Sequence, residues 1–111
     1  MDRLTTTFSA LADPTRRAIL ARLLDGPASI NQLAEPFAMT LPTVSRHIKV
    51  LADAGLVEKE KAAQARFCRL APDALALADD WLADYRRYFE SRFDRLDAQL
   101  RAEASPKGDQ S

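Results

Sequence analysis

The sequence predicts a mostly α-helical fold with five helices and one small, two-stranded β-hairpin. Three observations support this prediction. Apolar residues recur at helical spacing in several segments, residues 56–71 instead alternate in character, and residues 73–103 contain neither glycine nor proline. A chain of 111 residues with 47% hydrophobic and 29% charged residues also has the length and composition of one globular domain.

The first two helices are indicated by stripes and a start signal. The first stripe repeats at intervals of four and three residues and consists of Leu4, Phe8 and Leu11. Asp13 and Pro14 start the second helix, because Asp caps free backbone N–H groups and Pro fits the first turn. Its apolar residues are Ile19, Leu20, Leu23 and Leu24, and Gly26 and Pro27 stop it.

The third and fourth helices each have a cap. Ser29 and Gln32 have the spacing of a capping box, which predicts a short helix with Leu33 and Phe37 inward and Pro36 limiting its length. Thr40 can cap the fourth helix. That helix tolerates Pro42 in its first turn and ends at Ala54 and Gly55, since glycine readily takes the left-handed conformation.

The second half of the chain changes period. Residues 56–71 place apolar and basic residues on alternate positions, which predicts a hairpin with a charged tip around residues 62–65. A helix from Asp73 to about Glu103 follows. Its apolar stripe is Leu75, Ala78, Leu82, Tyr85, Phe89, Phe93, Leu96 and Leu100, widened by Trp81 and Tyr88. We therefore expect one domain over residues 1–104, with residues 105–111 as a disordered tail.

The fourth helix and the hairpin carry the functional signal. On a helical projection, Val44, Ile48 and Leu51 fall on one side, whereas Arg46 and Lys49 point to the other. The net charge is zero, but residues 40–70 hold six basic and three acidic residues. Two short helices followed by a charged hairpin make a winged helix-turn-helix, whose second helix fits the DNA major groove. A solvated amphipathic surface is the alternative interpretation of this helix.

Three strings make the similarity specific. ALADPTRRAIL (residues 10–20), TVSRHIKVL (residues 43–51) and AGLV (residues 54–57) resemble the ArsR/SmtB family of bacterial winged-helix repressors. The resemblance implies a homodimer that binds a palindromic double-stranded DNA operator. It also implies that the fourth helix lies in the major groove and that the wing lies along the backbone. Leu41 departs from the polar residue, often Gln, that many members carry there.

Two sets of site residues follow. The DNA-binding set combines positions that match the family with the basic residues of the fourth helix and wing: Thr40, Thr43, Ser45, Arg46, His47, Lys49, Lys59, Lys61 and Arg66. For His47, a capping or core-edge role is the alternative. The dimer set comes from the first and last helices: Leu4, Phe8, Leu82, Tyr85, Phe89, Phe93 and Leu96. An aromatic ligand pocket is the alternative use of the last helix.

The metal ligands of the family are missing. Ser29 and Asn31 stand where thiol-dependent members carry a Cys-x-Cys pair, and the last helix contains no His. With one His and one Cys in the chain, we expect no metal site, no metal response and no cofactor. The chain resembles a metal-free branch of the family.

Other activities are less favoured. Ser45 and His47 face different ways with no acid to orient the imidazole, so we expect no catalytic residues and no enzyme. Cys68 is interpreted as a small buried residue, and a redox-gated repressor acting through it is the alternative. For the whole domain, a winged helix that acts as a protein-interaction module is another alternative. No leader and no long apolar run is present, so we expect a cytoplasmic protein without membrane partners. Whether a small-molecule or protein effector acts on it is left open.

Overall fold

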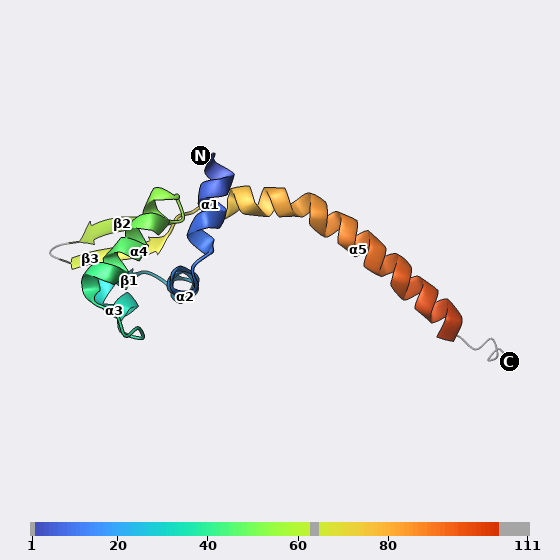
Figure 1. The fold of residues 1–111 in the computed structure, drawn as a ribbon, viewed down its shortest axis with the longest axis horizontal. Coiled ribbons are helices and arrows are strands. Elements are labelled where there is room, and N and C mark those ends of the chain that lie inside the picture. Colours follow the sequence, from blue (N-terminus) through green and yellow to red (C-terminus); the bar gives the residue numbers. More distant parts are fainter. Residues whose placement is uncertain (1, 63–64, 105–111) are drawn as a thin grey trace. The chain divides into compact units, whose positions relative to one another are not determined.

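The computed structural model describes residues 2–62 and 65–104. These residues form two compact units, and the division between the units falls between Ala78 and Asp79. The first unit contains four helices and a small sheet, and the second contains most of one long helix (Figure 1). The predicted tail at residues 105–111 and the middle of the predicted hairpin tip lie outside the described residues.

Helices α2, α3 and α4 follow their predicted caps, and α1 has a cap, Asp2, that was not predicted. α1 (Arg3–Leu11), α2 (Pro14–Leu23), α3 (Ile30–Ala34) and α4 (Leu41–Asp53) start after Asp2, Asp13, Ser29 and Thr40, and each of these side chains accepts a backbone N–H bond. The capping box of Ser29 and Gln32 is complete in both directions. Two details differ from prediction. Leu24 lies beyond the end of α2 and is 76% exposed, and Phe37 lies beyond α3, although it still packs against the core.

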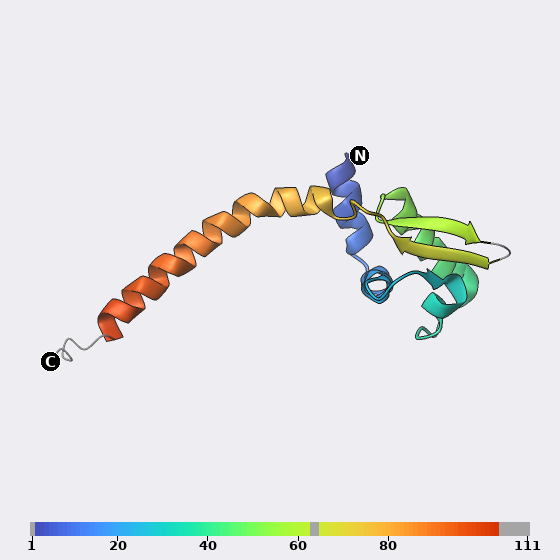
Figure 2. The same cartoon turned by 180° about the vertical axis from the view of Figure 1, so that it is seen from behind.

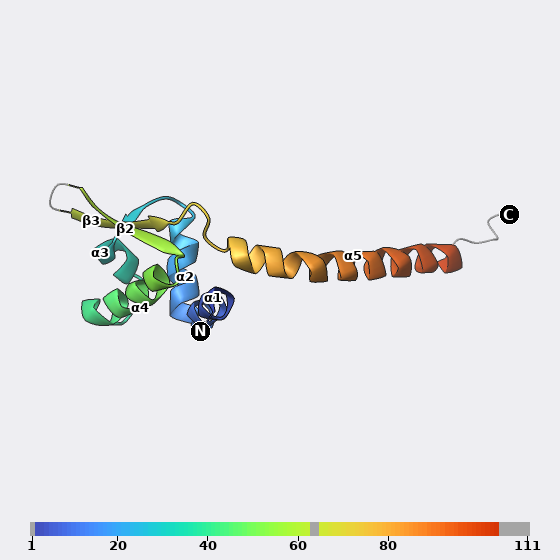
Figure 3. The ribbon, with the colours of Figure 1, turned by 90° about the horizontal axis from the view of Figure 1, so that it is seen from above.

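The predicted two-stranded hairpin is present, and a third, short strand that was not predicted extends the sheet. β2 (Val57–Ala62) and β3 (Ala65–Leu70) form the hairpin, and the two-residue strand β1 (Ala28–Ser29) pairs with the other edge of β3, in the order β1-β3-β2. A strand of two residues is too short to show an alternating pattern, so β1 could not be predicted from periodicity. Figures 2 and 3 show the hairpin from two further directions, with α3 and α4 together on one side of the sheet.

The last helix starts later than predicted. α5 spans Ala76–Ala104 instead of starting at Asp73. Leu75 has a φ of 68°, in the left-handed region that interrupts a helix, and turn bonds run from Ala74 N–H to Ala71 O and from Ala76 N–H to Asp73 O. Leu75 therefore does not belong to the apolar stripe of α5.

Side chains from the helices and from the sheet of the first unit pack together in one hydrophobic core. The largest fully buried side chains come from α2, α3, α4, the α4–β2 turn and β3: Ile19, Leu33, Val44, Ile48, Leu51, Leu56 and Cys68. In α1, Thr7 and Ala10 are the buried residues, while Leu4 is half-buried and Phe8 is 36% exposed. This core fixes α4 against the sheet by one side and leaves its other side accessible.

Candidate nucleic-acid interface

The exposed beginning of α4 carries a chain of hydrogen bonds. Thr40 Oγ1 accepts from the backbone N–H of Thr43 at 3.3 Å, and the two threonine hydroxyls lie 3.0 Å apart. Arg46 Nη2 donates to Thr43 Oγ1 at 3.1 Å. A guanidinium has five N–H donors, so this bond holds Arg46 over the first turn while leaving donors for another acceptor. Three of the predicted DNA-binding residues are thus brought together on one exposed helix end.

The remaining predicted residues of α4 differ in their surroundings. Ser45 is half-buried beside the sheet and lines a groove described below. Lys49 is exposed and forms an ion pair with Asp53 at 2.9 Å, with both side chains about two-thirds exposed (68% and 65%). An exposed i,i+4 pair contributes little to stability and exchanges readily, so Lys49 still presents a cation on this side of α4.

His47 is tied to the preceding helix. Its side chain is 20% exposed, and its Nδ1 lies 3.3 Å from Arg16 Nη1 and 3.9 Å from Asp13 Oδ2. Arg16 Nε also donates to Ala10 O at 2.7 Å, and Arg16 Nη2 donates to Ser9 O at 3.1 Å. This geometry favours the core-edge role of His47, because its Nδ1 faces α2 instead of the solvent.

Arg16 is a residue that sequence reasoning did not single out. One guanidinium joins the last carbonyls of α1 to the imidazole of α4, and the neighbouring Arg17 donates to Leu11 O at 2.7 Å. Such side-chain contacts over 31 residues of separation have no periodic signal. The only indication in the sequence was the pair of arginines within the family-like string ALADPTRRAIL.

The hairpin has two faces with different electrostatics. Cross-strand partners share a face, and the register pairs Lys61 with Arg66, Lys59 with Cys68 and Val57 with Leu70. The opposite face carries Arg69, whose Nη2 lies 2.9 Å from Glu58 Oε1 and 3.4 Å from Glu60 Oε2. The basic residue of that face is therefore neutralised within the hairpin.

The other face of the hairpin keeps its positive charge. Val57 and Cys68 at its base are buried against the core, and Lys59, Lys61 and Arg66 extend it toward the tip as exposed side chains. Among the residues that the structure describes, none of these three cations has an ion pair. Like charges directly opposite each other, as Lys61 and Arg66 are, cost stability unless an anion lies nearby.

A groove connects α4 to this face of the hairpin. It has a volume of about 330 Å³, and its lining includes Ser45 together with Lys59, Lys61 and Arg66. Ser45 of the helix and the three cations of the wing are therefore parts of one continuous surface of the first unit.

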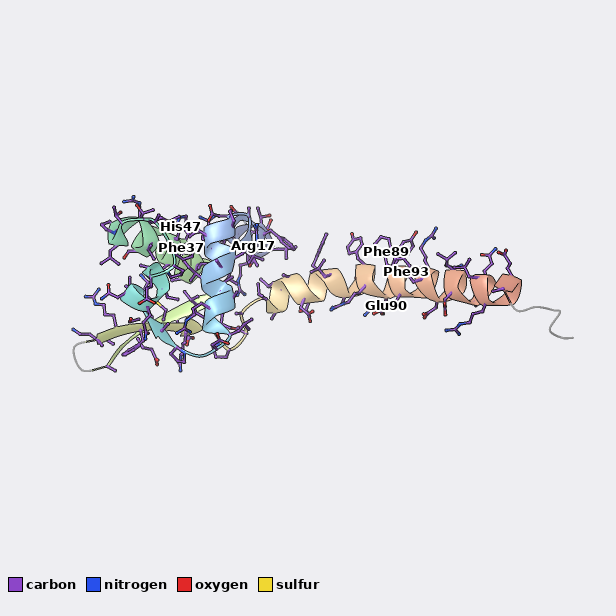
Figure 4. All side chains as sticks on the ribbon, turned by 90° about the horizontal axis from the view of Figure 1, so that it is seen from below. Arg17, Phe37, His47, Phe89, Glu90 and Phe93 are labelled. Atoms are coloured by element: carbon purple, nitrogen blue, oxygen red, sulfur yellow. The ribbon has the colours of Figure 1, made fainter. Side chains whose placement is uncertain are left out.

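The apolar stripe of α5 is uncovered. Among the described residues 79–104 none is buried, and the predicted interface residues Leu82, Tyr85, Phe89, Phe93 and Leu96 are between 43% and 64% exposed. The rings form contacts within the helix, with Trp81 and Tyr85 centroids 4.7 Å apart and Tyr88 and Phe89 centroids 5.1 Å apart. Figure 4 shows Phe89 on one side of the helix and Glu90 on the other.

The remaining candidate chemistry is limited. In the described ranges 2–62 and 65–104, no cluster of three or more His, Cys, Asp or Glu side chains is arranged to hold a metal ion. Burial raises the pKa of the Cys68 thiol, and the charge of Lys59 opposes this effect only in part. No helix of the described residues is long and apolar enough to span a membrane.

Comparison with known proteins places this geometry in a family. A helix-turn-helix domain family matches residues 11–60. The HTH-type transcriptional regulator Rv2034 of Mycobacterium tuberculosis is 45% identical over 69 residues, which cover 62% of this chain and 64% of that regulator, slightly less than two thirds of its length. The transcriptional repressor SdpR of Bacillus subtilis is 30% identical over 78 residues, which cover 70% of this chain and 87% of SdpR.

Solved structures agree. The crystal structure of the ArsR family transcriptional regulator RHA00566 is 40% identical, covers 80% of this chain and 98% of that chain, and has a TM-score of 0.73. The homodimeric winged helix-turn-helix DNA-binding domain of Mb0332 from Mycobacterium bovis, solved by NMR, is 26% identical, covers 91% of this chain and 84% of that chain, and has a TM-score of 0.61. The chain is therefore a member of the ArsR/SmtB family of winged helix-turn-helix transcriptional regulators.

Proposed function

We propose that this chain is a homodimeric, sequence-specific transcriptional repressor that places α4 in the major groove of a palindromic operator. The observation that carries the proposal is the arrangement of cations on the first unit. Arg46 lies over the exposed beginning of α4, and Lys59, Lys61 and Arg66 lie along one face of the hairpin, beside a groove that Ser45 of α4 also lines. A helix that reads base edges beside a strand pair that neutralises phosphates is what sequence-specific binding requires.

The residues divide into two roles. Arg46, Thr43 and Ser45 are assigned to base contacts, because they lie on α4 and their side chains carry hydrogen-bonding groups. Thr40 is assigned to a phosphate at the helix end, and Lys49 and the wing cations to phosphates along the backbone. His47 is assigned to positioning α4, since its Nδ1 faces Arg16. This assignment separates residues that set sequence preference from residues that set affinity.

The second copy of the chain is assigned to the exposed stripe of α5, together with Leu4 and Phe8 of α1. Five large apolar side chains on one helix, each at least 43% exposed, cost free energy in water unless another surface covers them. The Mb0332 domain is homodimeric by its description, which supports the same assembly here.

The repressor is proposed to respond to no transition metal. Ser29 stands at a position of the family's thiol pair, and its hydroxyl is already used to accept the N–H of Gln32 in the capping box. Asn31 stands at the other position. Added zinc, cadmium or arsenite is expected to leave operator affinity unchanged in a gel-shift titration. Tight zinc binding accompanied by release of DNA would contradict this part of the proposal.

Operator binding by three variants tests the proposal. Arg46→Ala should weaken binding to the specific site by about 1–3 kcal/mol and relax the preference at one base pair. Lys61→Ala should weaken all sequences alike and lower the salt dependence by about one counterion. Arg69→Ala is the matched control, because its charge is neutralised on the opposite face of the hairpin.

Each result has a clear meaning. Loss with Arg46→Ala and Lys61→Ala but not with Arg69→Ala supports the repressor. Equal, unchanged binding for all three variants across a salt series would overturn it and favour a winged helix that binds proteins. Binding that disappears only after oxidation of Cys68 would instead favour the redox-gated alternative, which the burial of this thiol disfavours.

A further inference from the structure

The groove between α4 and the hairpin combines cations, which could bind a DNA phosphate, with apolar side chains, which a phosphate does not require. Its walls carry the three wing cations, but Ile30 of α3, Ile48 of α4 and Cys68 of β3 also line it. Ile48 and Cys68 are almost fully buried and Ile30 is half-buried, so the bottom of the groove is the edge of the hydrophobic core. A phosphate group gains nothing from apolar surface of this kind.

The charge of the groove is strongly one-sided. Lys59, Lys61 and Arg66 line it, and the single acidic residue of the lining, Glu60, has its carboxylate 3.4 Å from Arg69 on the opposite face of the hairpin. Lys59 is paired across the hairpin with Cys68, and both residues line the groove. A ligand here would meet uncompensated positive charge above an apolar floor.

We propose that this groove binds a small carboxylate with an apolar body, such as an aromatic carboxylate, and that this ligand releases the operator. The volume of about 330 Å³ is at the lower end of the range of small-molecule pockets, which suits one or two fused rings. The carboxylate pairs with the wing cations while the rings lie over the half-buried Ile30. Because the same cations are assigned to phosphates, ligand and DNA compete for them. The release of DNA rests on the proposed function, whereas binding of the carboxylate does not.

The binding test uses three probes on the full chain without DNA. 2-Naphthoate carries both features, 2-naphthalenemethanol has the rings without the charge, and acetate has the charge without the rings. Titrations followed by amide NMR shifts should show saturable binding of naphthoate with shifts at Ile30, Lys59 and Cys68. The other two probes should bind at least tenfold more weakly. Equal binding of naphthoate and naphthalenemethanol, or shifts confined to the aromatic residues of α5, would overturn the proposal.

A filled groove provides the matched control. Ile30→Trp adds bulk to the lining and keeps every cation, and Ala21→Trp adds the same side chain at an exposed position of α2 outside the groove. Naphthoate affinity should fall at least tenfold in Ile30→Trp and stay unchanged in Ala21→Trp, with both variants showing the helical content of the wild type. If Ile30→Trp fails to fold, Lys61→Ala serves in its place and should weaken naphthoate binding at least fivefold. Unchanged affinity in the folded variant would overturn the site.

The second part of the proposal, release of the operator by the ligand, is tested separately with operator DNA. Naphthoate should raise the apparent Kd for the operator in proportion to its concentration in the wild type and in Ala21→Trp, but not in Ile30→Trp. Saturable naphthoate binding that leaves the operator Kd unchanged would overturn competition while retaining the site. If the wild-type chain binds naphthoate but shows no sequence-specific binding to DNA, the proposed repressor function is overturned instead.

Discussion

The two units of this chain treat their apolar side chains in opposite ways. In the first unit Ile19, Leu33 and Leu51 are at most 1% exposed, and the polar groups at the helix starts are capped. In the second unit Phe89 and Phe93 are 50% and 64% exposed. The first unit therefore has a hydrophobic core of its own, whereas the large apolar side chains of the second unit are exposed, and we propose that a second copy of the chain covers them.

The residues that we propose to contact DNA and the apolar stripe that we propose to form the dimer therefore lie in different units. The proposed base and phosphate contacts all lie on the unit with its own core, which fixes α4 and the hairpin relative to each other. The stripe of α5 lies on a helix whose other side is charged and carries ion pairs such as Arg86 with Asp79 at 3.0 Å. Exposed pairs of this kind add little stability, so they cannot replace the missing apolar contacts.

The largest expected effect comes from a charge in the stripe. Phe89→Asp should place one unpaired carboxylate per chain in the proposed interface, at a cost of about 3–5 kcal/mol for each uncompensated charge. We expect a monomer in sedimentation velocity and loss of specific operator binding, although every residue assigned to DNA is intact. Glu90→Gln, on the other side of α5, is the control and should stay dimeric.

The same experiment can break the comparison between the units. A folded Phe89→Asp protein that remains dimeric and binds the operator normally would mean that α5 does not need a second copy. An aromatic ligand pocket would then become the leading explanation for the exposed rings.

A pair of leucines sharpens the comparison. Leu51→Ala removes a side chain that is 0% exposed and should lower the free energy of unfolding by about 2–5 kcal/mol at any protein concentration. Leu96→Ala removes one that is 50% exposed and should act through the dimer, so that its effect shrinks as protein concentration rises. Denaturation at several concentrations measures both. Identical, concentration-independent losses would show that both leucines belong to one core.

Much of this contrast was readable from the sequence. Asp13, Ser29 and Thr40 cap the helices they were expected to cap, because capping is a local interaction within three residues. The prediction that Val44 and Ile48 lie on the buried side of α4 was correct, since helical periodicity alone determines which residues share that side. Features that depend on neighbours in sequence were therefore predictable.

The features that depend on distant contacts were not. The backbone of Leu75 is left-handed although nothing in its local sequence requires it, and β1 exists only because Ala28 and Ser29 meet β3. The contact of Arg16 with His47 and the groove over Cys68 need the tertiary fold before they appear. Site residues could be proposed from the sequence, but which of them share a surface could not.

Arg16 gives a smaller, more specific prediction for the first unit. Arg16→Ala removes donors to Ser9 O, Ala10 O and His47 Nδ1, and should cost roughly 1–3 kcal/mol of unfolding free energy because the partly buried Ala10 O and His47 Nδ1 lose their partner. Operator affinity should fall with it, since α4 loses its link to α1. Arg17→Ala is the control for α1 alone, because Arg17 donates to Leu11 O and has no bond to His47. Equal effects of the two variants on operator affinity would show that the link to His47 has no role.

The smallest expected effect is on the stability of the fold at acidic pH. The backbone N–H of Arg16 donates to the Asp13 carboxylate and holds the pKa of that carboxyl below its ordinary value of 3.8, with the charge of His47 adding to the effect. A carboxyl whose pKa is lower in the folded chain stabilises the fold above pH 3.8 and loses that contribution as the pH falls through the folded value.

Asp13→Asn keeps an oxygen that can accept the N–H of Arg16 but does not titrate. Its Tm should lie slightly below that of the wild type at pH 6, and the two values should converge as the pH falls below 4, a smaller change than that of Arg16→Ala. Thermal melts monitored by circular dichroism between pH 3 and pH 6 measure this convergence. A constant difference at every pH would mean that the amide differs from the carboxylate only in shape, and that the charge of Asp13 does not stabilise the beginning of α2. The acid sensitivity of the first unit would then have to come from other carboxylates, with Asp2 at the start of α1 the next to test, since the backbone N–H of Thr5 likewise holds its pKa low.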